Sequence, residues 1–170
     1  MLNTYDHEDA EPLKRNVEST IPALQQLITA TTERDEWIVY VQDNFGDWAA
    51  GRSELVRSAL DGEAPELVEP IIPPDHIPFV VKARHSIFYT TPLEYLLRSN
   101  DIDRVVLAGQ VTEQCILYSA LDAYVRHFEV VIPRDAVAHI DEELAEAAIR
   151  MMETNMRAQI LSAEESVPSR

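Results

Sequence analysis

The stretch VVLAGQVTEQCILYSALDAYVRHFEVVIPRDAVAHI, residues 105–140, decides the fold of this chain. An apolar run ends at Gly109, a stripe at helical spacing follows from Ile116 to Tyr124, and a second apolar run covers Phe128–Pro133. Such runs are typical of strands buried on both faces of a sheet, and such a stripe is typical of a covering helix. The order predicts a right-handed βαβ unit with two parallel strands.

The same alternation extends in both directions from this unit. Further apolar runs predict strands at 37–41, 79–81 and 158–161, and the unit's own strands are expected at 104–109 and 128–133. Helical patterns lie at 17–28, 53–60, 92–97, from 113 onward and at 142–156. We therefore predict a Rossmann-like three-layer α/β/α domain with a mostly parallel sheet.

Length and charge narrow the class of protein. The chain has 170 residues, which fits one domain spanning 1–170. It holds 30 acidic against 14 basic residues, a net charge of -16 that argues against nucleic acid and anionic membranes as partners. The N-terminus shows no signal-peptide pattern and no run is long enough to span a membrane, so we expect a cytoplasmic protein.

Open α/β sheets place their sites beyond the carboxyl ends of the strands, which directs attention to three residues. Cys115, the chain's one cysteine, follows the 104–109 strand, and with Thr112 as N-cap it would lie in a helix's first turn. There the helix dipole and free N–H groups favour a thiolate. Lys82 and Asp43 follow two other strands. The alternative is that Cys115 packs as a small apolar residue and Lys82 lies on an exposed loop.

Aromatic and imidazole side chains supply candidates for a substrate pocket. These candidates, each of which has ordinary packing or surface exposure as its alternative, are Phe45, Trp48, His85, Phe88 and Tyr118. The five histidines lie in separate segments without metal-ligand spacing, and no glycine-rich phosphate loop is present. We therefore expect neither a metal nor a nucleotide cofactor, and a small molecule as the substrate.

At this point the pattern resembles the isochorismatase-like cysteine hydrolases. The Gly-x-x-Thr-x-x-Cys turn at Gly109–Cys115, the ALDAY stretch and the Pro-x-Asp-Ala turn carry the resemblance, together with Val-Val-Lys ending at Lys82. The resemblance implies that Cys115 is a nucleophile and that Lys82 belongs to an Asp–Lys–Cys triad. It also implies a cis peptide between Val111 and Thr112, an oxyanion site formed by the N–H groups of Thr112 and Cys115, and a dimer or tetramer.

Two departures from the family pattern matter. Nicotinamidases of the family bind a metal through an Asp-x-His motif, and here Asp43, Asn44 and Phe45 stand in its place, without the histidine. The family also begins with an apolar central strand that ends in the triad's aspartate, and Met1-Leu2-Asn3 matches only the tail of that motif. The domain is thus expected to be truncated at its N-terminus, and we expect the natural product to start upstream of Met1.

Because members of the family that keep the cysteine usually cleave C–N bonds, the resemblance implies cleavage of a small amide or N-carbamoyl compound through an acyl-enzyme. Two alternatives stay open at this stage. One is a non-catalytic family member that lacks the triad aspartate. The other is a vinyl-ether hydrolase of the isochorismatase kind, in which Cys115 is incidental.

Overall fold

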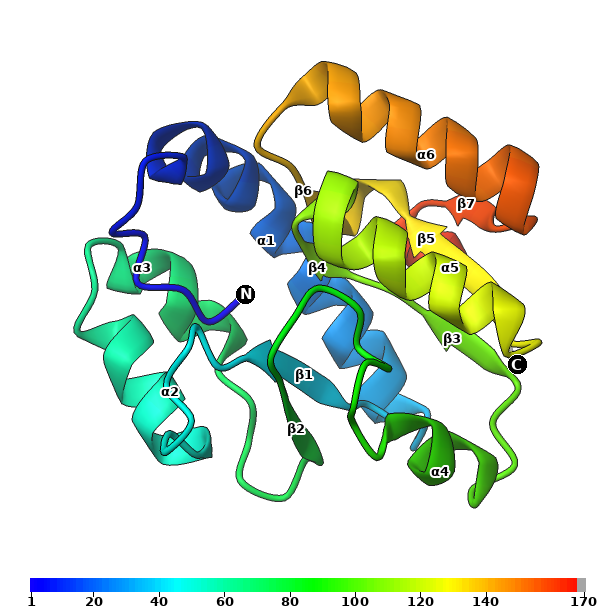
Figure 1. The fold of residues 1–170 in the computed structure, drawn as a ribbon, viewed down its shortest axis with the longest axis horizontal. Coiled ribbons are helices and arrows are strands. Elements are labelled where there is room, and N and C mark those ends of the chain that lie inside the picture. The colour runs from blue at the N-terminus through cyan, green and yellow to red at the C-terminus, as the bar shows by residue number, and fades with distance from the viewer. Residues whose placement is uncertain (168–170) are drawn as a thin grey trace.

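The computed structural model describes residues 1–167 and shows strands layered between helices (Figure 1). Every strand pair is parallel, as predicted. The strands form three separate ladders with the orders β1-β2, β3-β5-β7 and β4-β6. Their bounds are β1 Tyr40–Asp43, β2 Phe79–Lys82, β3 Arg104–Val106, β4 Gly109–Gln110, β5 Glu129–Pro133, β6 Val137–Ala138 and β7 Gln159–Leu161.

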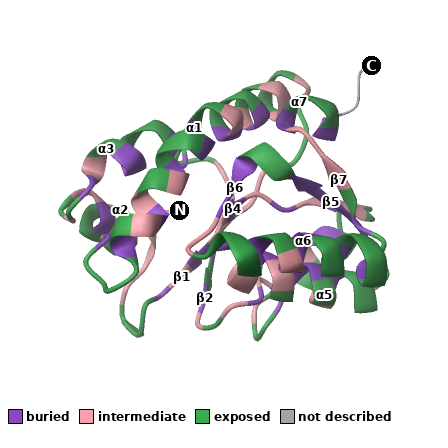
Figure 2. Ribbon diagram, turned by 90° about the horizontal axis from the view of Figure 1, so that it is seen from above, coloured by how far each residue is buried: buried purple, intermediate pink, exposed green. Residues whose placement is uncertain are grey.

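Helices cover both faces of the β3-β5-β7 sheet. Figure 2 shows α5 and α6 on one side of this sheet and α1 with α7 on the other. The helices are α1 Ala10–Glu33, α2 Arg52–Leu60, α3 Pro65–Val68, α4 Leu93–Arg98, α5 Leu117–Val125, α6 Glu142–Met156 and α7 Ala163–Ser166. Short turns of 3-10 type lie at Glu69–Ile71 (η1) and Arg134–Ala136 (η3), and a turn of π type lies at Thr112–Ile116 (η2). The mixed α/β architecture predicted from the sequence is therefore confirmed.

The largest cluster of buried apolar residues includes side chains of β5, α5 and α6. Ile132 in β5 and Met152 in α6 are both fully buried, in a cluster that also holds Phe88 and Phe128. Truncating such side chains removes apolar contacts and leaves a cavity, so this cluster contributes a large part of the stability. Within residues 1–167, no helix has the length and apolar character needed to cross a membrane.

The first five residues pack against the domain instead of extending into solvent. Tyr5 is fully buried and its hydroxyl donates to Gln110 Oε1 at 3.3 Å. Burial raises the pKa of this phenol to about 12. The segment also passes Gly62, where a Cβ would lie 2.5 Å from the carbonyl oxygen of Thr4. Only a residue without a side chain fits there, so Gly62 lets the N-terminal segment reach the sheet.

Replacing Gly62 by alanine should destabilise the fold. The new methyl group meets backbone atoms of Thr4, which cannot rotate away, and we expect a loss of about 1–3 kcal/mol in the free energy of unfolding. Thermal denaturation would show this as a melting temperature lower by several degrees. Gly51→Ala is the matched control, because its Cβ meets only the flexible carboxylate of Glu54. Equal melting temperatures for the two variants would contradict the packing described here.

Candidate active site

Asp43, Lys82 and Cys115 meet at one edge of the domain. Asp43 is the last residue of β1 and Lys82 the last of β2, and the two residues are register partners in this parallel pair. Lys82 Nζ lies 2.7 Å from Asp43 Oδ2 and 3.6 Å from Cys115 Sγ. The strand ends thus bring an acid, an ammonium group and a thiol into one contiguous arrangement, as their positions in the sequence predicted.

The lysine is the most enclosed of the three groups. Its side chain is 4% exposed, whereas the side chain of Asp43 is 24% exposed. A buried ammonium group needs anionic or polar partners, because removing it from water is costly. Asp43 supplies the anion on one side, and Cys115 lies on the other. The arrangement places a positive charge beside the thiol sulfur, where it would stabilise a thiolate.

A tight helical turn fixes the position of the thiol. Cys115 lies in η2, where the N–H groups of Gln114 and Ile116 both donate to the carbonyl of Val111 at 3.1 Å. The carboxylate of Glu113 accepts hydrogen bonds from the N–H groups of Ile140 and Asp141, each at 2.9 Å. These contacts tie the turn to the start of α6, so Cys115 is held on a rigid element and not on a free loop.

A cavity of about 620 Å³ opens beside the thiol. Its polar end holds Lys82, Cys115 and Gln42. Apolar side chains from α1, β1, β3 and the 87–102 region form most of the remaining wall. The site therefore places a thiol and an ammonium group beside a cavity whose lining is largely apolar.

Gln42 is a site residue that the sequence analysis did not single out. Its side-chain oxygen accepts from Leu2 N at 3.2 Å and its Nε2 donates to Leu2 O at 2.7 Å. The available signal was a polar residue at the end of an apolar run, but its partner lies 40 positions earlier in the chain. Through this pair the N-terminal segment is fixed at the cavity next to Cys115.

The Met1 α-amino group is buried in the same region. Desolvation lowers its pKa from 8.0 to about 6, and the charge of Lys82 acts in the same direction, whereas Cys115 and Asp43 oppose it. The folded chain therefore holds this amine neutral at pH values where the unfolded chain protonates it.

Stability of the 170-residue chain should consequently rise between pH 6 and pH 8. In this window the unfolded state binds more protons than the folded state, so the free energy of unfolding increases with pH by about 2–3 kcal/mol in all. Urea denaturation at pH 6, 7 and 8 measures the effect. The same chain acetylated at its N-terminus is the control and should lack this contribution. A free energy of unfolding that decreases from pH 6 to pH 8 in the chain with a free N-terminus, but not in the acetylated chain, would contradict the burial of the amine.

Two expectations about the turn before Cys115 are corrected. The cis peptide joins Gln110 to Val111 and not Val111 to Thr112. Strand β4 ends at Gln110, so the chain leaves the ladder at the next bond, one residue earlier than expected. Thr112 is the first residue of η2 and not its cap, and its hydroxyl donates to Ala138 O at 2.9 Å. The N–H groups of Thr112 and Cys115 nevertheless belong to the same short turn.

The five predicted pocket residues lie in different surroundings. Phe88 is buried in the core and stacks on Phe128 with ring centroids 5.7 Å apart, so it does not wall a pocket. Phe45 and Trp48 are exposed on the segment after β1. His85 and Tyr118 lie against each other, with ring centroids 5.5 Å apart. None of the five lines the cavity beside Cys115.

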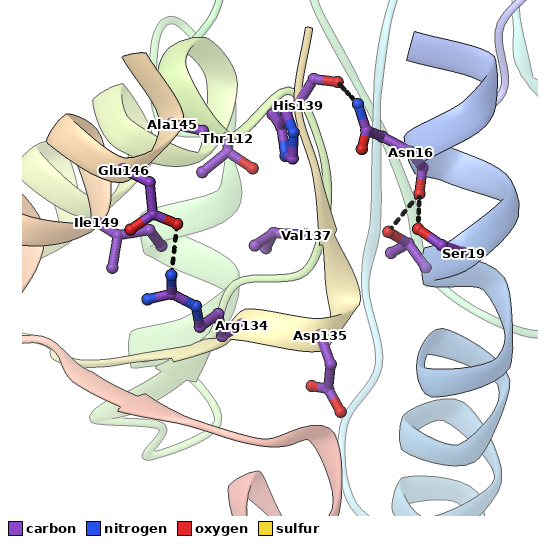
Figure 3. A pocket seen from close by; sticks show the side chains of 11 residues that line it. Asn16, Ser19, Thr112, Arg134, Asp135, Val137, His139, Ala145, Glu146 and Ile149 are labelled. Atoms are coloured by element: carbon purple, nitrogen blue, oxygen red, sulfur yellow. Dashed lines mark hydrogen bonds and ion pairs between the residues drawn. The ribbon is translucent and has the colours of Figure 1, made fainter. Parts of the chain in front are cut away.

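A second cavity, of about 310 Å³, lies between α1 and α6 (Figure 3). Thr112 lines this cavity and not the one beside Cys115. An ion pair between Arg134 and Glu146 spans one side, and on the other Asn16 Nδ2 donates to His139 O at 3.0 Å. Most of the other polar side chains here hydrogen-bond to backbone groups, which is typical of a structural cleft.

The residues in the metal-binding position of the nicotinamidase pattern do not fit a metal ion. Phe45 stands where the pattern has histidine, and Asp43 is engaged by Lys82. Among residues 1–167, no group of three or more histidine, cysteine, aspartate or glutamate side chains is arranged to hold a metal ion.

Comparison with known proteins agrees with the family resemblance seen in the sequence. The family model described as the isochorismatase domain matches residues 2–165. An uncharacterized isochorismatase family protein of Bacillus subtilis, YaaI, is 29% identical over 168 residues, which cover 98% of this chain and 92% of that protein.

Solved structures share the fold. Nicotinamidase PncA from Bacillus subtilis superimposes with a TM-score of 0.67 and 26% identity, over 94% of each chain. N-carbamoylsarcosine amidase from Thermoplasma acidophilum has a TM-score of 0.69 and 23% identity, over 88% of this chain and 86% of that one. The second likeness is one of fold alone.

Proposed function

Because the chain belongs to the isochorismatase family, whose relatives here include amidases, we propose that it hydrolyses the C–N bond of a small amide or N-carbamoyl compound with Cys115 as nucleophile. The main support for this proposal is the contact of Lys82 with both Asp43 and Cys115. Lys82 Nζ touches both the carboxylate, at 2.7 Å, and the sulfur, at 3.6 Å.

In the first half-reaction the sulfur of Cys115 attacks the substrate's carbonyl carbon and a C–S bond forms. The thiol proton moves to Lys82 Nζ as Lys82 passes one of its own to Asp43, so charge stays balanced. The N–H groups of Thr112 and Cys115 hold the resulting oxyanion. The C–N bond then breaks, and the leaving nitrogen takes the proton back through the same two groups.

In the second half-reaction water attacks the thioester carbonyl. The C–S bond breaks, the acid product leaves and the sulfur of Cys115 recovers a proton from the attacking water. The net reaction consumes one amide and one water and gives one acid and one amine or ammonia. In this mechanism Asp43 takes the role of the triad aspartate, which the family resemblance assigns to a residue preceding Met1.

A substrate panel and an Asp43 variant test the proposal together. Nicotinamide and N-carbamoylsarcosine represent the amidase relatives, and isochorismate represents the vinyl-ether alternative. We expect turnover of an amide or carbamoyl compound, and Asp43→Asn should lower its kcat/KM about 10- to 100-fold, because Lys82 loses its proton acceptor.

Asp75→Asn is the matched control for Asp43→Asn. Asp75 also pairs with a basic side chain, Arg52, but it is fully exposed to solvent. This variant should keep full activity. Turnover of isochorismate alone, or equal activity of Asp43→Asn and Asp75→Asn on amides, would contradict the proposal.

A further inference from the structure

The turn that holds Cys115 differs from a regular α-helical turn. In η2 the carbonyl of Val111 accepts from the N–H groups of Gln114 and Ile116, both at 3.1 Å. The second of these bonds joins residues i and i+5, the spacing of π-type turns, which are rare and occur frequently at functional sites. Because the bonding inside the turn departs from the α-helical pattern, contacts from outside are needed to fix the directions of its N–H groups.

Two side chains of the turn reach outside it. The Thr112 hydroxyl donates to Ala138 O at 2.9 Å. The Glu113 carboxylate accepts from Ile140 N and Asp141 N, each at 2.9 Å. These partners belong to the end of β6 and to the link from β6 to α6, so the turn is attached to two regular elements.

The carboxylate of Glu113 makes the charged attachment. Both N–H groups bond to the same oxygen, Oε1, and they lie at the amino end of α6, where the helix dipole favours an anion. Hydrogen bonds to an ionised carboxylate are roughly twice as strong as bonds between neutral groups. The other oxygen, Oε2, is buried and has no hydrogen-bond partner among residues 1–167. A buried oxygen without a partner costs stability, which points to a role beyond stability.

Glu113 lies between the two residues whose N–H groups hold the oxyanion in the proposed mechanism. It follows Thr112 directly and precedes Cys115 by two positions. Such donors act by pointing at the oxygen on which charge develops, and removing one typically lowers kcat by about 10²- to 10³-fold. A misplacement of about 1 Å by a change far from the chemistry can cost about 100-fold. A side chain that fixes this turn therefore controls the rate without touching the substrate.

We propose that Glu113 is a positioning residue for the hydrolysis, which fixes the η2 turn so that the N–H groups of Thr112 and Cys115 point at the developing oxyanion. This inference rests on the proposed function. The anchoring of the turn by Glu113 is in addition a property of the folded chain that can be measured without a substrate.

Glu113→Ala tests the proposal on the best amide of the substrate panel. The variant should lower kcat about 30- to 100-fold and change KM less than about threefold, because oxyanion donors act in the transition state. Glu113→Gln keeps an acceptor oxygen for the two N–H groups and should hold kcat within about threefold of the unsubstituted protein. Iodoacetamide loses iodide to Cys115 without forming an oxyanion, so its rate should change less than about threefold in both variants.

Asp135→Ala is the matched control. The Asp135 carboxylate also accepts from a backbone N–H at the start of a helix, that of Ala163 at 2.7 Å, but Asp135 lies outside η2. Asp135→Ala should keep kcat within about twofold. Hydrogen exchange at the Gln114 and Ile116 amides should be at least about tenfold faster in Glu113→Ala and unchanged in Asp135→Ala, because only the first variant releases the turn.

Three results would overturn the proposal. One is an equal kcat of Glu113→Ala and Asp135→Ala, and another is a Glu113→Gln variant as impaired as Glu113→Ala. The third is equal exchange at Gln114 and Ile116 in Glu113→Ala and the unsubstituted protein. Glu113→Gln also decides the question if the alanine variant does not fold. An unsubstituted protein that turns over no amide would instead refute the proposed function, and the exchange rates would still support or overturn the anchoring by Glu113.

Discussion

Replacing Cys115 by serine should abolish amide hydrolysis, with kcat/KM lower by about a thousandfold or more. The thiol lies 3.6 Å from the ammonium group of Lys82, whereas the hydroxyl of Ser119, which lines the same cavity, accepts a hydrogen bond from Ile87 N. A serine hydroxyl is far less acidic than a thiol, and Lys82 cannot ionise it to a useful extent. Steady-state rates on the best amide of the panel measure the effect.

The Cys115→Ala variant distinguishes amide hydrolysis through an acyl-enzyme from vinyl-ether hydrolysis. A vinyl-ether hydrolase with an incidental cysteine would keep its activity in this variant. Because Cys115 is half-buried and alanine is smaller, the variant should fold, which circular dichroism and the melting temperature can verify. Activity retained in a folded Cys115→Ala protein would rule out the acyl-enzyme.

Replacing Lys82 by methionine should lower kcat/KM about 100- to 1,000-fold and also reduce stability. Methionine keeps much of the length of the buried side chain but removes the charge between Asp43 and Cys115. The thiolate loses its cation, and the carboxylate of Asp43 is left partly buried without its partner. Activity and thermal denaturation, measured on the same preparation, report the two effects separately.

Lys14 provides a matched control, because it is the other lysine of the chain and also forms an ion pair, with Glu11 at 2.5 Å. Lys14→Met should leave activity unchanged. Lys82→Arg should restore little, since the planar guanidinium does not fit the position of a compact ammonium group between two partners. Full activity of the Lys82→Met variant would show that Lys82 takes no part in the reaction.

Much of the fold follows from local sequence patterns. Each of the five predicted strands overlaps an observed strand, and the predicted helix at 142–156 has the bounds of α6. The meeting of Asp43 with Lys82 also follows, because neighbouring parallel strands bring their carboxyl ends together. In these cases the deciding information lies in a few consecutive residues.

Other features depend on contacts between distant segments. Strands β4 and β6 have two residues each, too few for a hydrophobic period to be recognised. Phe88 follows a strand as a pocket residue would, but Phe128, 40 positions later, holds it in the core. Tyr5 lies in a polar segment, and its burial depends on distant partners, among them Val111 in the same core cluster and Gln110, which accepts its hydroxyl. Partners this far apart leave no local signal.

The rate at which iodoacetamide modifies Cys115 at pH 7 tests the central claim most directly. The chain has one cysteine, so the label reports this thiol alone. In the folded protein we predict a rate at least several times that of the same chain unfolded in urea, even though the folded thiol is half-buried, and we predict that Lys82→Met removes the excess. A folded-state rate at or below the unfolded one would show that Cys115 is a packing residue, and would contradict its assignment as the nucleophile.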